Sequence, residues 1–415
     1  MVMDVLFERC AGLDVSKRDA KACIRVTGPG GLATQTITTW TSMTNQVREL
    51  AQHLLSERVG LVIIEATGDY WRQFYFLLED AGLNVQLVNA KDARNLPGRK
   101  TDVSDAAWLA QLGAYGLVRG CLVPPADIRV IRDLTRARTA ITDEKSREIQ
   151  RLEKMLESSG IKLSSVATDL VGVSGRAMLE ALIRGEDDPT MLADLSKARM
   201  RSKIPDLVEA LTGRFNEHHA FMARLFLDRI DAHDTDIDRL DVRLSEVMAP
   251  FEATRVLLMS IPGISERVAD VIIAETGGDM SVFPTAGHLA SWAGTAPGSN
   301  ESAGRVKSTK TRPGNRYLKR ALGTAALSIT RSKTTYLGAK YRRIKSRRGA
   351  MKALVAVEHS ILIATWHMLT HGELYKDPGS DYFVKLRPGQ TQTRAIKQLE
   401  SLGYTVTLEP LKMAG

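Results

Sequence analysis

Two consecutive prolines, Pro124 and Pro125, separate two parts of the sequence that have different hydrophobic periods. Before them, short apolar runs alternate with helical patterns, whereas after them apolar residues keep to helical spacings over a long stretch. Strands that come first, followed by strands alternating with helices, indicate an α/β domain that ends near residue 122. A mainly helical region should follow the prolines.

The α/β part has a clear order of expected elements. We expect strands at residues 9–27 (two strands joined by a tight bend), 33–39, 60–64 and 84–88. Helices are expected at Thr44–Leu55, Trp71–Ala81 and Asp102–Leu112. Glu65 ends the 60–64 run, where the apolar residues before it should bury its position.

The helical part contains two apolar seams. One has the spacings of a heptad repeat and comprises Ile230, Ile237, Leu240, Leu244 and Val247. The other comprises Ile141, Ile149, Leu152 and Leu156. The two segments pair either as an antiparallel hairpin or as a dimerising coiled coil, with shorter helices between them over residues 160–213.

These patterns give four expected domains. They are an α/β domain (1–122), a helical spacer (123–250), a mainly helical domain (251–350) and a C-terminal helix with an accessory tail (351–415). The third opens with a helix, a Pro-Gly turn and a second helix, a pattern similar to the helix-hairpin-helix units that bind DNA phosphates. In the tail we expect a helix at Thr393–Leu402 and a strand at Tyr404–Leu408.

Positive charge is concentrated in one block. The net charge is +9, but residues 302–357 contain 16 Lys or Arg and no Asp or Glu. The rest of the chain holds 41 basic and 48 acidic residues. Like charges at this density repel one another, and a polyanion relieves the repulsion. With Tyr317, Tyr336 and Tyr341 interleaved for stacking, the block favours nucleic acid over a membrane surface.

The remaining composition narrows the class of protein. Three cysteines, Cys10, Cys23 and Cys121, form no C-x-x-C pair, which indicates a reducing compartment and no structural zinc. The first twelve residues are too charged for a signal peptide. The apolar stretch Leu354–Leu369 is too short and too polar to span a bilayer. We therefore expect a cytoplasmic, nucleoid-associated protein with no membrane partner.

Four carboxylates are candidates for a metal site. Asp14 and Glu65 end predicted strands, while Asp102 and Asp105 share one helix face. Four crowded carboxylates repel unless a cation neutralises them, and their hard oxygens suit Mg²⁺ or Mn²⁺. Two such ions can stabilise both the attacking and the leaving oxygen of a phosphodiester.

Several motifs resemble the DEDD insertion-sequence transposases, the IS-one-ten and IS-eleven-eleven group that includes the pilin-gene invertases. The N-terminal motifs are Gly12-Leu-Asp14-Val, Ile64-Glu65-Ala-Thr-Gly68-Asp-Tyr70 and Lys100-Thr-Asp102-Val-Ser-Asp105-Ala106. The C-terminal motifs include Ser260-Ile-Pro-Gly-Ile264, Ala274-Glu275-Thr-Gly277, Glu301-Ser302-Ala-Gly304 and Gly314-Asn315-Arg316-Tyr-Leu318-Lys-Arg320. The resemblance covers residues 9–122 and 255–345.

The resemblance implies a RuvC-like, RNase H-type first domain, a coiled-coil spacer and a C-terminal transposase domain. It implies that Asp14, Glu65, Asp102 and Asp105 bind metal and that Ser302 is the nucleophile that joins transiently to a DNA phosphate. Donor and target DNA, a structured guide RNA encoded by the element and further copies of the chain, as a dimer or tetramer, are the implied partners. Here Ala303 separates the serine from Gly304, and Ser299 and Ser308 lie in the same loop.

The candidate nucleic-acid contacts lie in the basic block and beside the carboxylates. They are Lys100, Arg305, Lys307, Lys310, Arg312, Asn315, Arg316, Lys319 and Arg320. The resulting hypothesis is a transposase or recombinase that cuts and rejoins DNA strands. Two alternatives remain open: a metal-dependent junction resolvase or nuclease without a covalent intermediate, and a nucleic-acid-binding protein without catalysis.

Overall fold

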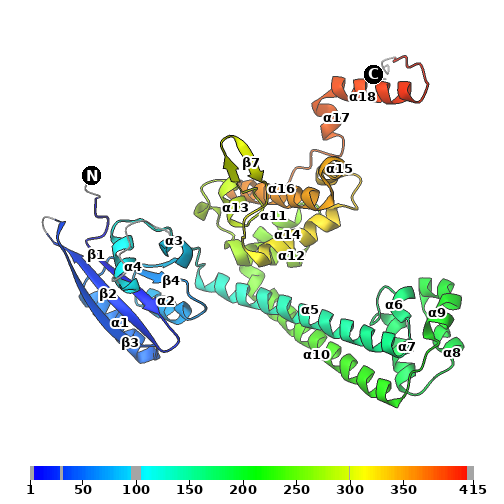
Figure 1. The fold of residues 1–415 in the computed structure, drawn as a ribbon, viewed down its shortest axis with the longest axis horizontal. Helices are drawn as coiled ribbons and strands as arrows, with labels where there is room; N and C mark the ends of the chain where they lie inside the picture. The colour runs from blue at the N-terminus through cyan, green and yellow to red at the C-terminus, as the bar shows by residue number, and fades with distance from the viewer. Residues whose placement is uncertain (1–3, 29–30, 95–103, 299, 409–415) are drawn as a thin grey trace. The chain divides into compact units, whose positions relative to one another are not determined.

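The computed structural model describes residues 4–28, 31–94, 104–298 and 300–408 (Figure 1). The chain divides into two compact units, an N-terminal unit of residues 1–123 and a C-terminal unit of residues 124–415. An α/β unit with a mixed sheet, followed by a helical region, confirms the coarse fold prediction. The finer division into four domains stays a prediction.

The N-terminal unit is built on a five-stranded sheet with the order β3-β2-β1-β4-β5. Its strands are β1 (Arg9–Val15), β2 (Asp19–Thr27), β3 (Ala33–Thr41), β4 (Leu61–Glu65) and β5 (Val85–Val88). The first three pair antiparallel, whereas β4 pairs parallel with both β1 and β5. The sheet therefore contains every strand that the sequence predicts in this unit.

The two faces of the sheet pack against different helices, because side chains alternate between the faces along each strand. Leu13 and Ile64 pack with α1 (Thr44–Ser56) and α2 (Trp71–Asp80). Cys10 and Ile63 pack with α4 (Asp105–Ala114) on the other face. A short helix that the sequence did not suggest, α3 (Ala90–Arg94), follows β5.

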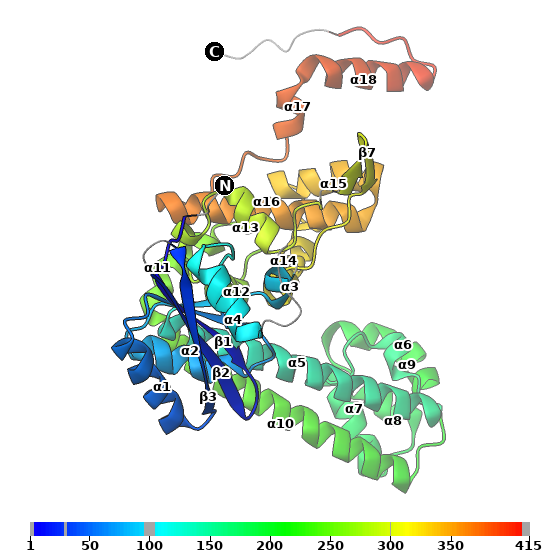
Figure 2. The same ribbon diagram turned by 60° about the vertical axis from the view of Figure 1, so that its left-hand side comes forward.

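Two long helices, α5 (Ala126–Ser158) and α10 (Glu217–Met248), lie side by side in both ribbon views (Figures 1 and 2). They run antiparallel, because residue numbers fall along α10 as they rise along α5 in the ion pairs Arg138–Asp241, Lys145–Asp234 and Glu148–Arg229. Ile237 and Leu244 of the predicted seam are buried. The two seams thus pair within one chain.

A small helical group connects the far ends of this pair. It comprises α6 (Leu163–Val166), α7 (Val173–Ile183), α8 (Pro189–Asp194), η2 (Ala198–Lys203) and α9 (Ile204–Leu211). Leu163, Leu179, Leu192 and Leu207 form a core with Leu152 and Leu227 of the long helices.

The remaining C-terminal elements form one group with a long helix, α16 (Ala350–His371), on which several of the other helices pack. These elements are η3 (Ala249–Phe251), α11 (Glu252–Met259), α12 (Glu266–Thr276), η4 (Met280–Val282), α13 (Ala286–Trp292), β6 (Asn300–Ser302), β7 (Arg305–Ser308), α14 (Arg316–Ile329) and α15 (Tyr336–Arg348). Among the described residues, α16 is the one helix that is long and apolar enough to cross a membrane, by length and composition alone. These helix contacts suit a core helix better than a membrane span.

The Pro-Gly turn between α11 and α12 lies against α14. A Cβ at Gly263 would stand 2.8 Å from the Ala325 carbonyl oxygen and 2.6 Å from Ile329 Cγ1. Close packing therefore accounts for this glycine, and a role in binding phosphate stays a prediction.

The tail contains α17 (Tyr382–Leu386) and α18 (Pro388–Ser401), neither of which has a buried residue. The predicted helix is present within α18. The strand predicted at Tyr404–Leu408 is wrong, because these residues form no β-bridge. A strand needs a neighbouring strand to form hydrogen bonds with. The alternation of apolar and polar residues within one segment does not indicate whether such a neighbour is present.

Candidate active site

Two of the candidate carboxylates follow adjacent parallel strands. Leu13 of β1 is opposite Ile64 of β4, so Asp14 and Glu65 come next at the same edge of the sheet. Both fall on the face that α4 covers, because side chains alternate between faces along a strand. Glu65 is only 9% exposed and Asp14 is half-buried.

A glycine brings the third carboxylate to this place. Gly12 lies two residues before Asp14, and a Cβ there would stand 2.2 Å from the Ala106 carbonyl oxygen and 2.4 Å from the Ala110 nitrogen. Only a residue without a side chain lets α4 lie directly on β1. Since α4 begins at Asp105, this contact brings the Asp105 carboxylate toward Asp14.

The charges at this edge of the sheet influence one another. Burial raises the pKa of the Asp14 carboxyl above its usual value, and the carboxylates of Asp105 and Glu65 raise this pKa further, while Lys21 lowers it. Thr67 Oγ1 donates to Glu65 Oε1 at 3.1 Å. Ser104 Oγ accepts from the Ala107 nitrogen and fixes the start of α4.

The donor set suits a hard divalent cation. Carboxylate oxygens are the preferred ligands of Mg²⁺, and a cation would relieve the repulsion that raises the pKa of Asp14. Within the described part of the chain, no three acidic, His or Cys side chains are close enough to enclose an ion. Asp102, the fourth predicted ligand, and Lys100 lie outside the described residues.

The predicted nucleophile lies on a β-hairpin in a segment that the sequence pattern indicated as a loop. Ser302 ends β6, Arg305 begins β7, and the two residues are direct partners in the strand register. Ala303 and Gly304 between them have φ values of 50° and 73°. Two consecutive positive φ values are those of a two-residue type I′ turn. The only signal in the sequence was Gly304, since alanine is rare in such turns.

Glycines also fix the base of this hairpin. A Cβ on Gly314 would stand 2.3 Å from the Ala293 carbonyl carbon, so the two backbone segments touch. The Gly298 nitrogen donates to the Lys310 carbonyl at 3.0 Å, and Pro297 and Thr311 form a bridge. The hairpin therefore projects from a tightly joined base.

An open hollow with a basic lining lies at the base of the hairpin. It measures about 700 Å³ and is lined by Gly298, Ser308, Lys310, Thr311, Arg312, Pro313 and Lys319. We call it the basic hollow. Lys319 Nζ donates to the Gly294 carbonyl and to Thr311 Oγ1, each at 3.2 Å. With three cations and no carboxylate in its lining, the hollow suits a phosphate group.

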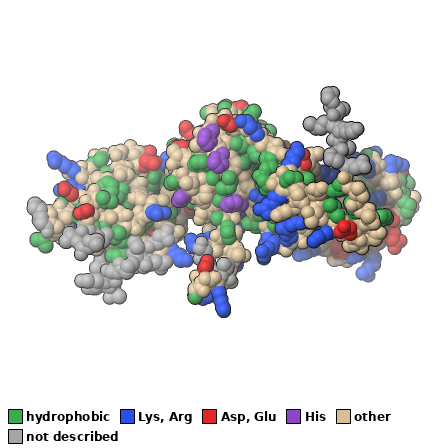
Figure 3. Space-filling view, turned by 90° about the horizontal axis from the view of Figure 1, so that it is seen from above, with side chains coloured by type: hydrophobic (Ala, Val, Ile, Leu, Met, Phe, Trp, Pro, Cys, Tyr) green, Lys and Arg blue, Asp and Glu red, His purple; other side chains and the backbone are tan. Residues whose placement is uncertain are grey.

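Lysine and arginine side chains gather in a patch on the face drawn in Figure 3. Among the predicted nucleic-acid contacts, Arg305, Lys307, Lys310 and Arg312 are exposed. Besides Lys319, two others have protein partners: Arg316 donates to the Tyr317 hydroxyl at 2.7 Å, and Arg320 forms a two-point pair with Asp143 at 2.5 Å. Arg316 and Arg320 are exposed as well, so what sets them apart is that their guanidinium groups already have protein partners.

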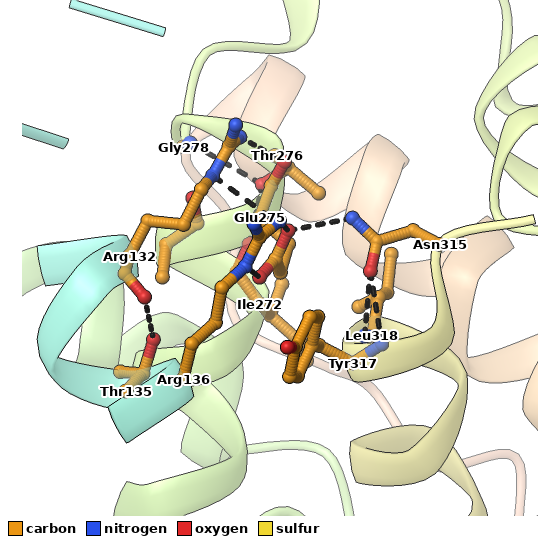
Figure 4. A network of polar contacts seen from close by, with 11 residues as sticks. Arg132, Thr135, Arg136, Ile272, Glu275, Thr276, Gly278, Asn315, Tyr317 and Leu318 are labelled. Carbon is orange, nitrogen blue, oxygen red and sulfur yellow. Dashed lines mark hydrogen bonds and ion pairs between the residues drawn. The ribbon is translucent and has the colours of Figure 1, made fainter. Parts of the chain in front are cut away.

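A buried polar cluster around Glu275 connects α5, α12 and α14 (Figure 4). Glu275 is fully buried and accepts two hydrogen bonds from Arg136, both at 2.8 Å, and one from Asn315 Nδ2 at 2.6 Å. Arg132 donates to the backbone carbonyls of Ala274 and Glu275. Asn315, predicted to contact nucleic acid, therefore has a structural partner for its amide.

Two family models match separate parts of the chain. Residues 11–160 match the family model of the DEDD transposases of the IS110 type, described as "Transposase". Residues 255–342 match the family described as "Transposase IS116/IS110/IS902 family". These matches define the chain as a transposase of the insertion-sequence class. It belongs to the DEDD IS110 family.

Two relatives illustrate the similarity. The insertion element IS110 uncharacterized 43.6 kDa protein of Streptomyces coelicolor is 36% identical over 124 residues, which cover 29% of this chain and 30% of that protein. The insertion element IS900 uncharacterized 42 kDa protein of Mycobacterium paratuberculosis is 29% identical over 328 residues, covering 72% of this chain and 80% of the relative.

Proposed function

We propose that this transposase cuts and rejoins DNA strands with a divalent-metal site at Asp14, Glu65, Asp102 and Asp105 and a nucleophile at Ser302. One observation carries the proposal: β1, β4 and α4 bring Asp14, Glu65 and Asp105 to one edge of the sheet, where burial and the two neighbouring carboxylates raise the pKa of Asp14. The strand order β3-β2-β1-β4-β5, with two antiparallel pairings followed by two parallel ones, supports a RuvC-like, RNase H-type domain. Bound Mg²⁺ or Mn²⁺ would stabilise the negative charge that develops on the phosphate.

The serine step conserves the phosphodiester energy. The Ser302 hydroxyl oxygen attacks the phosphorus and forms a phosphoserine ester, while the bond from phosphorus to the 3′ oxygen breaks. The proton that the serine loses ends on the leaving 3′ oxygen. Attack by a 3′ hydroxyl in the exchanged position reverses the step and frees the serine, so no ATP is needed. The exposure of Ser302 at the end of β6 supports this role.

The partners follow from the charge and the family. The exposed cations of residues 302–357 are proposed to hold donor and target DNA and a structured guide RNA. Recombination holds four strand ends together, so we propose a dimer or tetramer. The α5–α10 pair is proposed to be the coiled-coil spacer of this assembly.

The test is to trap the protein–DNA complex and map the peptide that carries DNA. We expect an adduct at Ser302 that is absent in Ser302→Ala and present in Ser308→Ala. Asp105→Asn should abolish both the adduct and strand cleavage. Full recombination by Ser302→Ala would refute the serine step. Cleavage that depends on Asp105 but leaves no adduct would favour the junction nuclease instead.

A further inference from the structure

The register of the β6–β7 hairpin places one arginine directly across from the proposed nucleophile. Ser302 and Arg305 are paired residues on either side of the two-residue turn. Directly opposed residues of antiparallel strands point to the same face, with Cβ atoms about 4.5–5.5 Å apart. Both residues are exposed. A group that reaches the Ser302 hydroxyl therefore also comes within reach of the Arg305 guanidinium.

The same alternation keeps the nearest carboxylate away. Glu301 precedes Ser302 in β6, so it belongs to the opposite face of the hairpin. The face that presents the serine thus has a positive neighbour and no negative one from its own strand. A phosphate, which carries negative charge, can approach this face without repulsion from Glu301.

The turn that places these two residues opposite each other contains a residue in a disfavoured backbone conformation. Ala303 has a φ of 50°, a left-handed region that residues with a side chain rarely adopt. A longer loop would avoid the strain but would lose the direct opposition of the two residues. Strained residues of this kind occur preferentially at functional sites.

We infer that Arg305 is a catalytic residue, which binds the non-bridging oxygens of the phosphate that Ser302 attacks. The inference rests on the proposed function. A guanidinium presents several N–H donors in one plane and stays charged, so it can bind two phosphate oxygens at once. It would stabilise the additional negative charge that the phosphate carries in the transition state. It transfers no proton.

Other cations of the block are less well placed for this task. Arg316 and Arg320 are engaged with Tyr317 and Asp143. Lys310, Arg312 and Lys319 line the basic hollow at the base of the hairpin. We assign the reacting phosphate to Arg305, whose contact determines the rate. The neighbouring phosphates of the same strand are assigned to the basic hollow, whose contacts determine the affinity.

The first test separates rate from affinity in the full-length protein with guide RNA and DNA. We expect Arg305→Gln to lower the single-turnover rate of the Ser302 adduct by about 10²–10³-fold at saturating DNA. Arg305→Lys should recover part of this loss. The matched control, Arg239→Gln, removes an exposed arginine of α10 outside the basic block and should leave the saturated rate within a few-fold. Equal rates for Arg305→Gln and the wild type would overturn the inference.

The second test locates the interaction on the phosphate. A methylphosphonate at the scissile position removes the negative non-bridging oxygen, so the wild type should lose the advantage that Arg305 provides. The ratio of the wild-type rate to the Arg305→Gln rate should then fall to near one. An undiminished ratio would show that Arg305 acts elsewhere. If the wild type forms no adduct at Ser302 on ordinary DNA, the serine step of the proposed function fails, and the role of Arg305 fails with it.

Discussion

Asn315 Nδ2 donates to the buried carboxylate of Glu275 at 2.6 Å, while Asn315 Oδ1 accepts from the backbone nitrogens of Tyr317 and Leu318. One side chain therefore both caps α14 and ties the end of the serine-containing loop to α12. Because Arg136 of α5 shares the same carboxylate, the long spacer helix takes part in this contact. The position of the serine-containing loop is thus linked to that of the spacer.

Replacing Glu275 by Gln should strongly destabilise the C-terminal unit. The change leaves the partly buried guanidinium of Arg136 without its counter-charge, and breaking a buried pair costs about 3–5 kcal/mol. Arg136 keeps some exposure, so we expect the lower end of this range. Urea unfolding followed by helical circular dichroism measures the change. Glu266→Gln, on the same helix but 60% exposed, should cost less than about 1 kcal/mol. Equal effects of the two variants would contradict this assignment.

The sheet and its helices were predictable because their signals are local. The run Leu61–Ile64 is apolar throughout, and Val47, Leu50 and Leu54 repeat at helical spacing, so the pattern within each segment was sufficient. The positions of Asp14 and Glu65 at strand ends followed from these runs. Their proximity to Asp105 did not, because it depends on α4 crossing β1 at Gly12.

The long-range polar contacts could not be predicted from the sequence either, because they too depend on how distant segments pack together. Glu275 and Asn315 are 40 positions apart, and Arg320 and Asp143 are 177 apart, so no local period links them. The β6–β7 hairpin was missed because its turn is Ala-Gly and its strands lack apolar alternation. The number of charges in the basic block does not distinguish Arg320 from Arg312. In the structure, Arg320 has an acidic partner in Asp143, whereas Arg312 lines the basic hollow.

Replacing Gly12 by Ala should disturb the carboxylate site without changing any carboxylate. The new methyl group would overlap the backbone of α4, and such overpacking costs about 1–3 kcal/mol. The helix must shift, which moves Asp105 relative to Asp14, so strand cleavage should fall with stability. Gly60→Ala is the control, because its nearest neighbour would be 3.5 Å away. If Gly12→Ala cleaves DNA at the wild-type rate, the close approach of α4 to β1 does not set the geometry of the site.

The raised pKa of Asp14 predicts how pH affects the metal-free protein. A carboxyl whose pKa is higher in the folded state stabilises the fold at low pH, and this contribution disappears as pH rises through the folded-state pKa. Asp105→Asn removes one neighbouring charge, so in EDTA at pH 7 the variant should unfold at a higher temperature than the wild type. The difference should disappear on lowering the pH to about 4 or below.

Added Mg²⁺ should reverse this order. The ion relieves the repulsion in the wild type, whose unfolding temperature should rise, while the variant lacks one ligand and should respond less. Asp80→Asn, on α2 at the other face of the sheet, should behave like the wild type in both conditions. An identical response of Asp105→Asn and the wild type to Mg²⁺ would argue against Asp105 as a ligand.

The salt dependence of nucleic-acid binding should distinguish the cations of the basic hollow from Arg320. Removing a cation that binds one phosphate reduces the slope of log affinity against log salt by about 0.7–0.9. Lys310→Gln and Arg312→Gln should each cause such a reduction, because both side chains are exposed and line the hollow. Arg320→Gln should change the slope less, because the Arg320 guanidinium is already paired with Asp143.

Removal of the acidic partner provides the opposite change in charge. Asp143→Asn frees Arg320 without altering the hollow, so the affinity for nucleic acid should increase. The slope should become steeper by at most the value for one additional phosphate, about 0.7–0.9. The pair is 50% and 37% exposed, so breaking it should cost at most about 1 kcal/mol of stability. Titrations of the four single variants and the wild type at several salt concentrations measure all these slopes. If Arg320→Gln flattens the slope as much as Lys310→Gln does, Arg320 leaves Asp143 for a phosphate in the complex, and the distinction between the two kinds of cation is wrong.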